Sequence, residues 1–220
     1  ILQQDLLVRN IRRNLVKKLF DLLNGLEQEQ YEKFWQEFGA VLKVGVHTDI
    51  ENKNKMADLL RYKTTKSDGQ WKSLQQYVKD MPPDQKEIYY ITGENLSALI
   101  NSPLLEQLKS KNFEVLLMTD PIDEWVTQAL TEYDGKKLKS AEKGDLDLDK
   151  VDEDKKGQYE TLFKHIRAKL EDTIKEVRPS TRLTDSVACL SGNTYDMSGY
   201  MEKILKSAGQ TTPENKRVLE

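Results

Sequence analysis

Cysteine and histidine are scarce in this chain of 220 residues, and long apolar runs are absent. A single cysteine, Cys189, excludes an internal disulfide and fits a reducing compartment. The histidines, His47 and His165, lie far from each other and from Cys189, so no pair has the spacing of metal ligands. No apolar run approaches the ~18 residues of a membrane span. Mean hydropathy is -0.70, and no secretory signal opens the sequence.

The charge balance excludes a further class of function. Lys and Arg number 34 against 37 Asp and Glu, which gives a net charge of -3 and a pI near 5.7. Nucleic-acid-binding domains carry excess positive charge, so nucleic acid is not expected as a partner. The hydrophobic share of 37% supports folded cores. The sequence has no starting Met and opens inside an apparent helix, so we interpret it as a piece of a longer protein.

Residues 1–62 have the pattern of a helical segment. A long amphipathic helix is predicted from Leu2 to Gln28, because apolar residues recur at three- and four-residue steps: Val8, Ile11, Leu15, Leu19, Leu22 and Leu26. A second helix is predicted from Tyr31 to about Gly45. A third, with Asp49 as its cap, carries an apolar face of Met56, Leu59 and Leu60.

Residues 73–140 have the pattern of a small αβα layer unit. It follows a polar stretch, 63–70, that is predicted to be a loop. Ser73 and Gln76 form a capping box at the start of a short helix. Strands are predicted at 88–92 and 115–118. Helices are predicted over 95–111, interrupted at Ser102-Pro103, and from Asp120 to Leu130. This order of elements predicts parallel strands joined by a right-handed crossover.

The last eighty residues divide into a linker and a second unit. Residues 141–158 are acidic and hold too few apolar side chains for a core, so they are predicted to form an exposed linker. Residues 159–220 predict a small α+β unit: a helix from Tyr159 to Ile174, a strand over 187–190, a helix from Thr194 to Ala208 and a polar tail. Its core is expected to be thin. The predicted fold class is α/β in the layered unit and α+β overall.

Signatures of catalysis are absent from the sequence. It contains no glycine-rich phosphate loop and no nucleophile–base arrangement, so neither a catalytic nor a metal site is predicted. Asp120, Asp123 and Glu124 cluster where a helix begins, which is typical of capping. An alternative function remains open: a small α/β ligand-binding or enzymatic domain, with its site at the carboxyl ends of the strands, near Thr92-Gly93 and Thr119-Asp120.

Two features suggest binding, although each also has a structural interpretation. Trp125 follows two acidic residues in the first turns of a predicted helix, where it is either half-buried core or an exposed anchor for a partner. The last predicted helix carries an apolar stripe that either faces a core or forms an adaptable surface, because methionine conforms to many partner shapes. The stripe comprises Met197, Met201, Ile204, Leu205 and Ala208.

Several segments resemble the heat-shock protein 90 chaperone family in collinear order. They are residues 1–4 (ILQQ), 11–18, 86–93 (KEIYYITG), 114–125 (EVLLMTDPIDEW), 132–136 (EYDGK) and 180–185 (STRLTD). Residues 34–39 and 123–125 resemble the bacterial form of the family. The resemblance implies that 1–140 is the later part of a middle domain and that 159–220 is a C-terminal domain without its dimerisation helices.

The family's properties are carried over only at matching positions. The resemblance implies a cytoplasmic chaperone fragment that binds unfolded or partly folded client proteins and has no enzymatic activity or cofactor of its own. The full-length parent would be a homodimer that hydrolyses ATP with magnesium, and Gln3 would be its nucleotide-sensing residue. The catalytic arginine would precede Ile1. The implied client-binding residues are Glu124, Trp125, Gln128, Met197, Met201, Ile204 and Leu205.

Overall fold

A computed structural model describes residues 6–146, 148, 153–212 and 215–220. It begins with three helices: α1 (Leu6–Asn24), α2 (Gln28–Thr48) and α3 (Lys53–Leu59). The predicted first helix is too long. It ends at Asn24, where the Gly25 N–H bonds to the carbonyls of Asp21 and Leu22, and a new helix begins at Gln28. The predicted cap is also wrong, since Asn52 is the N-cap of α3 and Asp49 accepts from its backbone N–H.

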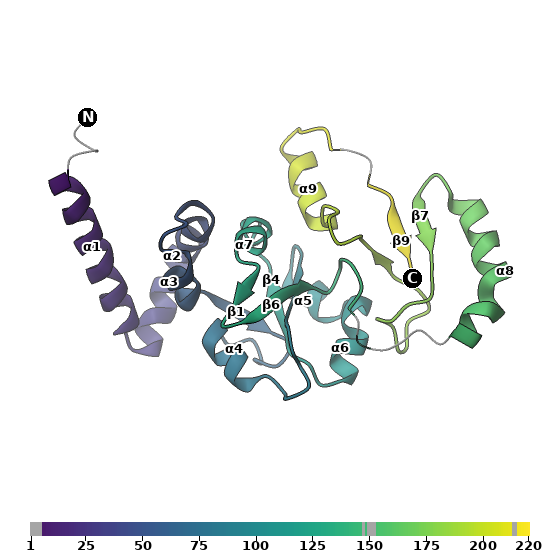
Figure 1. Ribbon diagram of the computed structural model, residues 1–220, viewed down its shortest axis with the longest axis horizontal. Coiled ribbons are helices and arrows are strands. Elements are labelled where there is room, and N and C mark those ends of the chain that lie inside the picture. The colour runs from purple at the N-terminus through teal and green to yellow at the C-terminus, as the bar shows by residue number, and fades with distance from the viewer. Residues whose placement is uncertain (1–5, 147, 149–152, 213–214) are drawn as a thin grey trace.

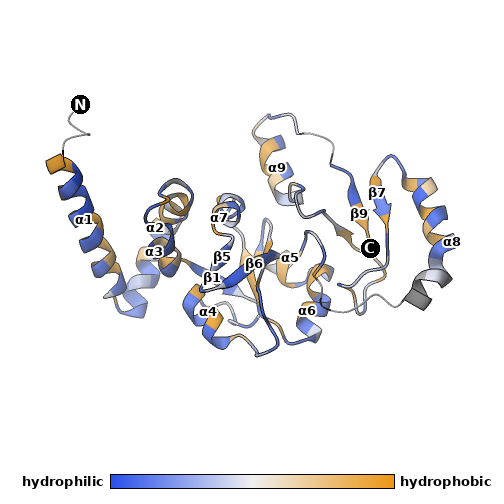
Figure 2. Cartoon of the chain, viewed as in Figure 1, coloured by the Kyte–Doolittle hydropathy of each residue, from blue (hydrophilic) through white to orange (hydrophobic). Residues whose placement is uncertain are grey.

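The apolar stripe of α1 is largely exposed. Figure 1 shows α1 leading away from the rest of the molecule, and Figure 2 shows apolar residues recurring along it. Leu15 is 65% exposed, whereas Leu23, near the end of the helix, is buried. Contact with the first core is therefore made by the last turn of α1 and the residues that follow it, with Phe20 and Leu26 packed beside Leu23.

The first unit is built on a six-stranded sheet of order β2-β1-β4-β3-β6-β5. Its strands are β1 (Arg61–Thr64), β2 (Lys72–Ser73), β3 (Ile88–Thr92), β4 (Val115–Met118), β5 (Glu132–Tyr133) and β6 (Lys136–Ser140). The predicted pair is confirmed, because β3 and β4 are parallel with Thr92 opposite Met118. The predicted loop at 63–70 is wrong at its start, since Lys63 and Thr64 belong to β1. This strand is half polar, with only Tyr62 and Thr64 buried, so no apolar run marks it.

Helices cover both faces of this sheet and confirm the three-layer arrangement. Alternate residues of β4 point to opposite sides, with Leu116 and Met118 in one core and Val115 and Leu117 in the other. The first core also holds residues of α2, α3, α4 (Leu74–Asp80) and α7 (Asp123–Ala129). The second holds residues of α5 (Leu96–Ile100), of the 3₁₀ turn Pro103–Leu105 and of α6 (Glu106–Ser110).

Half of the predicted capping box is present at the start of α4 and gives a first prediction: Ser73 caps the helix, while the Gln76 amide bonds to Asp80. The Ser73 hydroxyl accepts from the Gln76 N–H at 3.0 Å. Ser73→Ala should lower the free energy of unfolding by about 1 kcal/mol, because it leaves that donor without its cap. Urea denaturation measures the loss. Ser97→Ala is the control: Ser97 is exposed in α5, and its hydroxyl makes no hydrogen bond within the described ranges. Equal losses in the two variants would contradict a capping role.

The segment predicted as an exposed linker contributes to a core. Ala141 and Leu146 are buried and belong to the second core of the first unit, so the prediction that its apolar residues are too sparse to pack is wrong for Leu146. The helix that follows, α8 (Glu153–Leu170), is amphipathic only weakly and exposes Tyr159 and Leu162. It lies at the opposite end of the molecule from α1 (Figure 1).

The second unit differs from its prediction at several boundaries. It holds β7 (Ile174–Val177), β8 (Leu190–Ser191), α9 (Gly199–Ser207) and β9 (Arg217–Leu219), with strand order β7-β9-β8. Ile174 therefore belongs to a strand, Val187 is fully exposed outside β8, and the tail predicted as merely polar supplies the central strand β9. The last helix begins at Gly199 rather than Thr194, because the Asp196 carboxylate accepts from the Asn193 N–H in a preceding turn.

Candidate functional site

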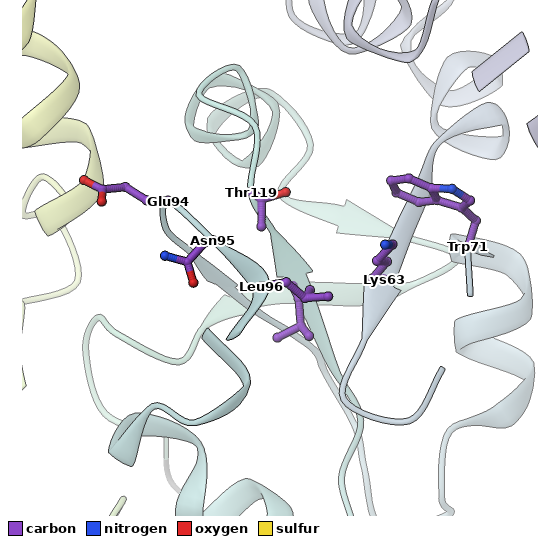
Figure 3. A pocket seen from close by; sticks show the side chains of 7 residues that line it. Lys63, Trp71, Glu94, Asn95, Leu96 and Thr119 are labelled. Atoms are coloured by element: carbon purple, nitrogen blue, oxygen red, sulfur yellow. The ribbon is translucent and has the colours of Figure 1, made fainter. Parts of the chain in front are cut away.

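The structure brings together the two helices that carry the predicted client-binding residues. The Ser198 hydroxyl, at the start of α9, donates to Glu124 Oε1 of α7 at 2.5 Å. The Tyr200 hydroxyl donates to the Thr119 carbonyl at 3.1 Å, and Lys203 Nζ lies 3.0 Å from Glu94 Oε1. Glu94 and Thr119 follow the carboxyl ends of β3 and β4. Figure 3 shows Glu94 directed toward the ribbon of α9. We call this set of contacts the α7–α9 seam.

The seven predicted residues divide by exposure. Gln128 is exposed, and Trp125, Met197, Ile204 and Leu205 are half-buried. Two others are buried, namely Glu124, which is 2% exposed, and Met201, which is 9% exposed. The expectation of an exposed stripe is therefore wrong at Met201. Gln3, the predicted nucleotide-sensing residue, lies outside the described residues.

Trp125 is half-buried but lies outside both described cores, so it combines the two interpretations that the sequence left open. Its neighbour Val126 is fully buried and supplies the contact of α7 with the first core. The indole is thus partly accessible on α7, while Val126 supplies the contact of this helix with the first core.

A second carboxylate meets the start of α9. Glu142 accepts from the Gly199 N–H at 2.8 Å and pairs with Arg217, which also reaches Glu202 of α9 at 2.9 Å. Burial raises the pKa of Glu142 above its usual value, while the bond from Gly199 and the charge of Arg217 oppose that rise. Negative charge at a helix N-terminus is favourable because the backbone N–H groups there have no partner in the helix.

A buried charge cluster links α2 to the start of α7. Lys43 Nζ of α2 lies 2.5 Å from Asp120 Oδ2 and 2.9 Å from Asp123 Oδ1, and its side chain is 4% exposed. Its charge also faces the ring of Tyr62 at 4.8 Å, and the Tyr62 hydroxyl donates to Asp123. Burial raises the pKa of Asp123 to about 6, although Lys43 lowers it. The capping interpretation is wrong for α7, whose N-cap is Ile122 and which has no side-chain cap bond; Asp123 accepts instead from the Asp120 N–H in the preceding turn.

The sequence analysis missed Lys43, although a signal was present. In α2 the buried positions are Tyr31, Trp35, Gly39, Lys43 and Val46, which form one row at three- and four-residue steps. A lysine in the middle of that row must be buried with a counter-charge, because an unpaired buried ammonium is very costly.

Two further residues, Glu106 and Arg182, connect the first unit to the second and were not among the predicted site residues. The Glu106 carboxylate of α6 accepts from the backbone N–H groups of Thr184, Asp185 and Ser186 and from the Ser186 hydroxyl. These bonds, with the Ser186 hydroxyl first, lower the pKa of Glu106 to about 2. Arg182, fully buried, donates to the carbonyls of Ala141 and Gly144.

The alternative site at the strand ends is small and chemically sparse. A cavity of about 190 Å³ lies there (Figure 3), below the ~300–1,000 Å³ typical of small-molecule sites. Its charged groups are already engaged: Lys63 Nζ lies 5.1 Å from the centre of the Trp71 ring, and Glu94 pairs with Lys203. The lining residues are Lys63, Trp71, Glu94, Asn95, Leu96, Leu117 and Thr119. They include no nucleophile–base pair.

The remaining candidate groups give no second site. Burial raises the pKa of the Cys189 thiol to about 11, so it is protonated and unreactive at neutral pH. In the described ranges, His, Cys, Asp and Glu side chains form no group of three or more that could hold a metal ion. None of the helices described combines the length and apolar character needed to cross a bilayer.

Comparisons with known proteins agree with this fold. The family model described as Hsp90 protein matches residues 1–220. The chaperone protein HtpG of Geobacter metallireducens is 44% identical over all of this chain and 36% of its own length, and that of Methylococcus capsulatus is 44% identical over all of this chain and 37% of its own. The chain therefore spans little more than a third of these relatives.

A solved structure extends the likeness to three dimensions. The middle domain of a Plasmodium falciparum heat shock protein matches with a TM-score of 0.61 and 35% identity, covering 63% of this chain and 58% of that one. The family resemblance of the sequence motifs is thus confirmed, including its bacterial character. This chain belongs to the Hsp90 family and is similar to its bacterial HtpG members.

Proposed function

We propose that this chain forms a client-binding part of an ATP-dependent molecular chaperone, a client being an unfolded or partly folded protein. The observation that carries the proposal is Trp125, a half-buried indole outside both cores on α7, the helix whose Glu124 bonds to the start of the amphipathic helix α9. Tryptophan anchors are enriched at binding hot spots. Exposed Gln128, one turn further along α7, adds a polar contact.

The mixed character of this surface suits partners of many sequences. Met197, Ile204 and Leu205 are half-buried, so each offers a limited apolar area that can adapt to different side chains. Such contacts are individually weak. A homodimeric parent would present two copies of the surface, and linkage of the two would strengthen binding without any new contact.

The proposal assigns the other activities of the parent to parts outside this chain. ATP with magnesium would bind elsewhere in a cytoplasmic, full-length protein, and this chain would not hydrolyse it. Gln3 would approach the nucleotide only in that parent. We further propose that 1–140 belongs to the middle domain and 159–220 to the C-terminal domain. The competing proposal of an enzymatic domain has no supporting group in the 190 Å³ cavity, and turnover of ATP by this chain alone would contradict ours.

Trp125→Ala should weaken client binding about tenfold, because truncation of a hot-spot tryptophan costs more than ~1 kcal/mol. The measurement is a titration of the labelled chain with reduced, carboxymethylated α-lactalbumin, which stays unfolded. NMR follows the Trp125 indole in the unsubstituted chain, and the methyl groups of Met197 and Met201 in both the unsubstituted chain and the Trp125→Ala variant. Stability should change much less than the ~3–5 kcal/mol of a core tryptophan, since Trp125 lies in neither core.

Tyr159→Ala is the matched control for this prediction. Tyr159 is an aromatic residue that is 50% exposed on α8, at the far end of the molecule from α7. It should leave the affinity unchanged. Equal weakening by both substitutions would mean that the unfolded chain adheres to any exposed aromatic group, and the proposed surface would be wrong.

A further inference from the structure

We propose that Glu124 is a positioning residue: its carboxylate holds Ser198 and so fixes the start of α9 against α7, and it does not contact the client itself. This inference rests on the proposed function, because it concerns the same surface. It changes the role of one residue within that surface from direct contact to support.

The first argument is accessibility. Glu124 is 2% exposed, so a client would find almost none of its surface, whereas Trp125 and Gln128 on the same helix are accessible. A buried carboxylate is costly unless it is hydrogen-bonded. The Ser198 hydroxyl supplies that bond at 2.5 Å.

The second argument is the geometry of the Ser198 hydroxyl. Ser198 is 1% exposed, and its oxygen accepts from the Met201 N–H at 3.0 Å as the N-cap of α9. Its own O–H group is buried and needs an acceptor, and Glu124 provides it. One hydroxyl therefore ties the first turn of α9 to α7.

The third argument is that the attachments of α9 gather at its N-terminus. It spans nine residues, too short to be stable in isolation, and Met201 is its one buried side chain. The pair Lys203–Glu94 is exposed on both sides, so solvent weakens it. The other described polar contacts of α9 with neighbouring segments all lie in its first turn, where Ser198 meets Glu124, Gly199 meets Glu142, Tyr200 meets Thr119 and Glu202 meets Arg217.

Three substitutions separate positioning from contact. Glu124→Gln keeps an acceptor oxygen for Ser198 but removes the charge, whereas Glu124→Ala removes both. Ser198→Gly deletes the hydroxyl while leaving an N-cap residue that helices tolerate. We expect Glu124→Ala and Ser198→Gly each to raise amide hydrogen exchange in residues 203–207 about tenfold without client, and to weaken binding of carboxymethylated α-lactalbumin by a similar factor. Glu124→Gln should stay close to the unsubstituted chain in both hydrogen exchange and binding.

The pattern across variants decides between outcomes. The double variant of Glu124→Ala and Ser198→Gly should be no worse than Ser198→Gly alone, because that substitution already removes the bond between Glu124 and Ser198 together with the cap of α9. If Glu124→Gln weakens binding as much as Glu124→Ala while exchange in α9 is unchanged, the carboxylate contacts the client and the inference is overturned. If exchange responds as expected but Trp125→Ala does not affect binding, the positioning role stands and the proposed function fails. Gln128 is exposed on the same helix, so Gln128→Ala should leave amide hydrogen exchange in α9 unchanged.

Discussion

Lys43→Met should lower the free energy of unfolding by about 3–5 kcal/mol at pH 7.5, as expected when one partner of a buried ion pair is removed. Methionine fills a similar volume, so packing against the rings of Trp35 and Tyr62 is retained and the loss reports mainly on charge. Asp123 is completely buried and would lose its cation. Asp120, whose side chain is 52% exposed, can be solvated instead. Urea denaturation measures the change.

The loss should depend on pH in a definite direction. Burial already raises the pKa of Asp123 to about 6, and without Lys43 it should rise further, because Lys43 lowers it. The unfolded aspartate titrates near pH 4. Between these values the folded state binds the proton that the unfolded state has released, so the contribution of Asp123 to stability falls as the pH rises. Lys43→Met should therefore be less destabilising at pH 5 than at pH 7.5.

Lys33→Met provides the comparison for Lys43→Met. Lys33 lies on the same helix, is 74% exposed at its side chain and pairs with exposed Glu29. Its removal should change stability by less than about 1 kcal/mol at either pH. A Lys43→Met variant that lost the same free energy at both pH values would show that its cost comes from packing and not from the charge on Asp123.

Local signals in the sequence predicted the central elements of the fold. The β-rich runs at 88–92 and 115–118 have both faces covered, so they read as short apolar strands. The cap at Ser73 and the helix break at Ser102-Pro103 depend only on residues nearby in the sequence, so they could also be predicted. The hairpin β5–β6 was missed although Asp134-Gly135, both with positive φ, form its two-residue turn. Its strands are short and rich in lysine, so no apolar alternation marks them.

The site could be predicted only in part, because its supports are long-range pairs. Lys43 meets Asp123 across 80 positions, and Glu106 meets Ser186 across the same number. No periodicity within one helix reports such partners. The sequence singled out residues of α7 and α9 as candidates, but it could not show that Glu124 is covered by Ser198, 74 positions away. Glu124 was therefore expected to contact a client directly, although its side chain is buried.

Arg182→Leu should cost about 3–5 kcal/mol, because it breaks a buried ion pair and leaves carbonyl groups without their donor. Arg182 is fully buried; its Nη1 lies 2.6 Å from Glu220 Oε1, and its Nε donates to the Ala141 carbonyl at 3.0 Å. The arginine thus ties the end of β9 to residues after β6. Hydrogen exchange in β7 and β9 should show the loss directly, even where unfolding of the two units is not a single transition.

The charge on Glu220 makes this prediction separable from a loss of packing. Burial raises the pKa of Glu220, but Arg182 and the Ser191 hydroxyl outweigh it and hold the pKa below its usual value. Adding Glu220→Gln to Arg182→Leu should recover part of the loss, because the amide leaves no unbalanced buried charge. Arg167→Leu, exposed on α8, should be close to neutral. A double variant no more stable than Arg182→Leu would mean that Arg178, 2.7 Å from the same carboxylate, already balances its charge, so that Arg182 acts through its bonds to the Ala141 and Gly144 carbonyls.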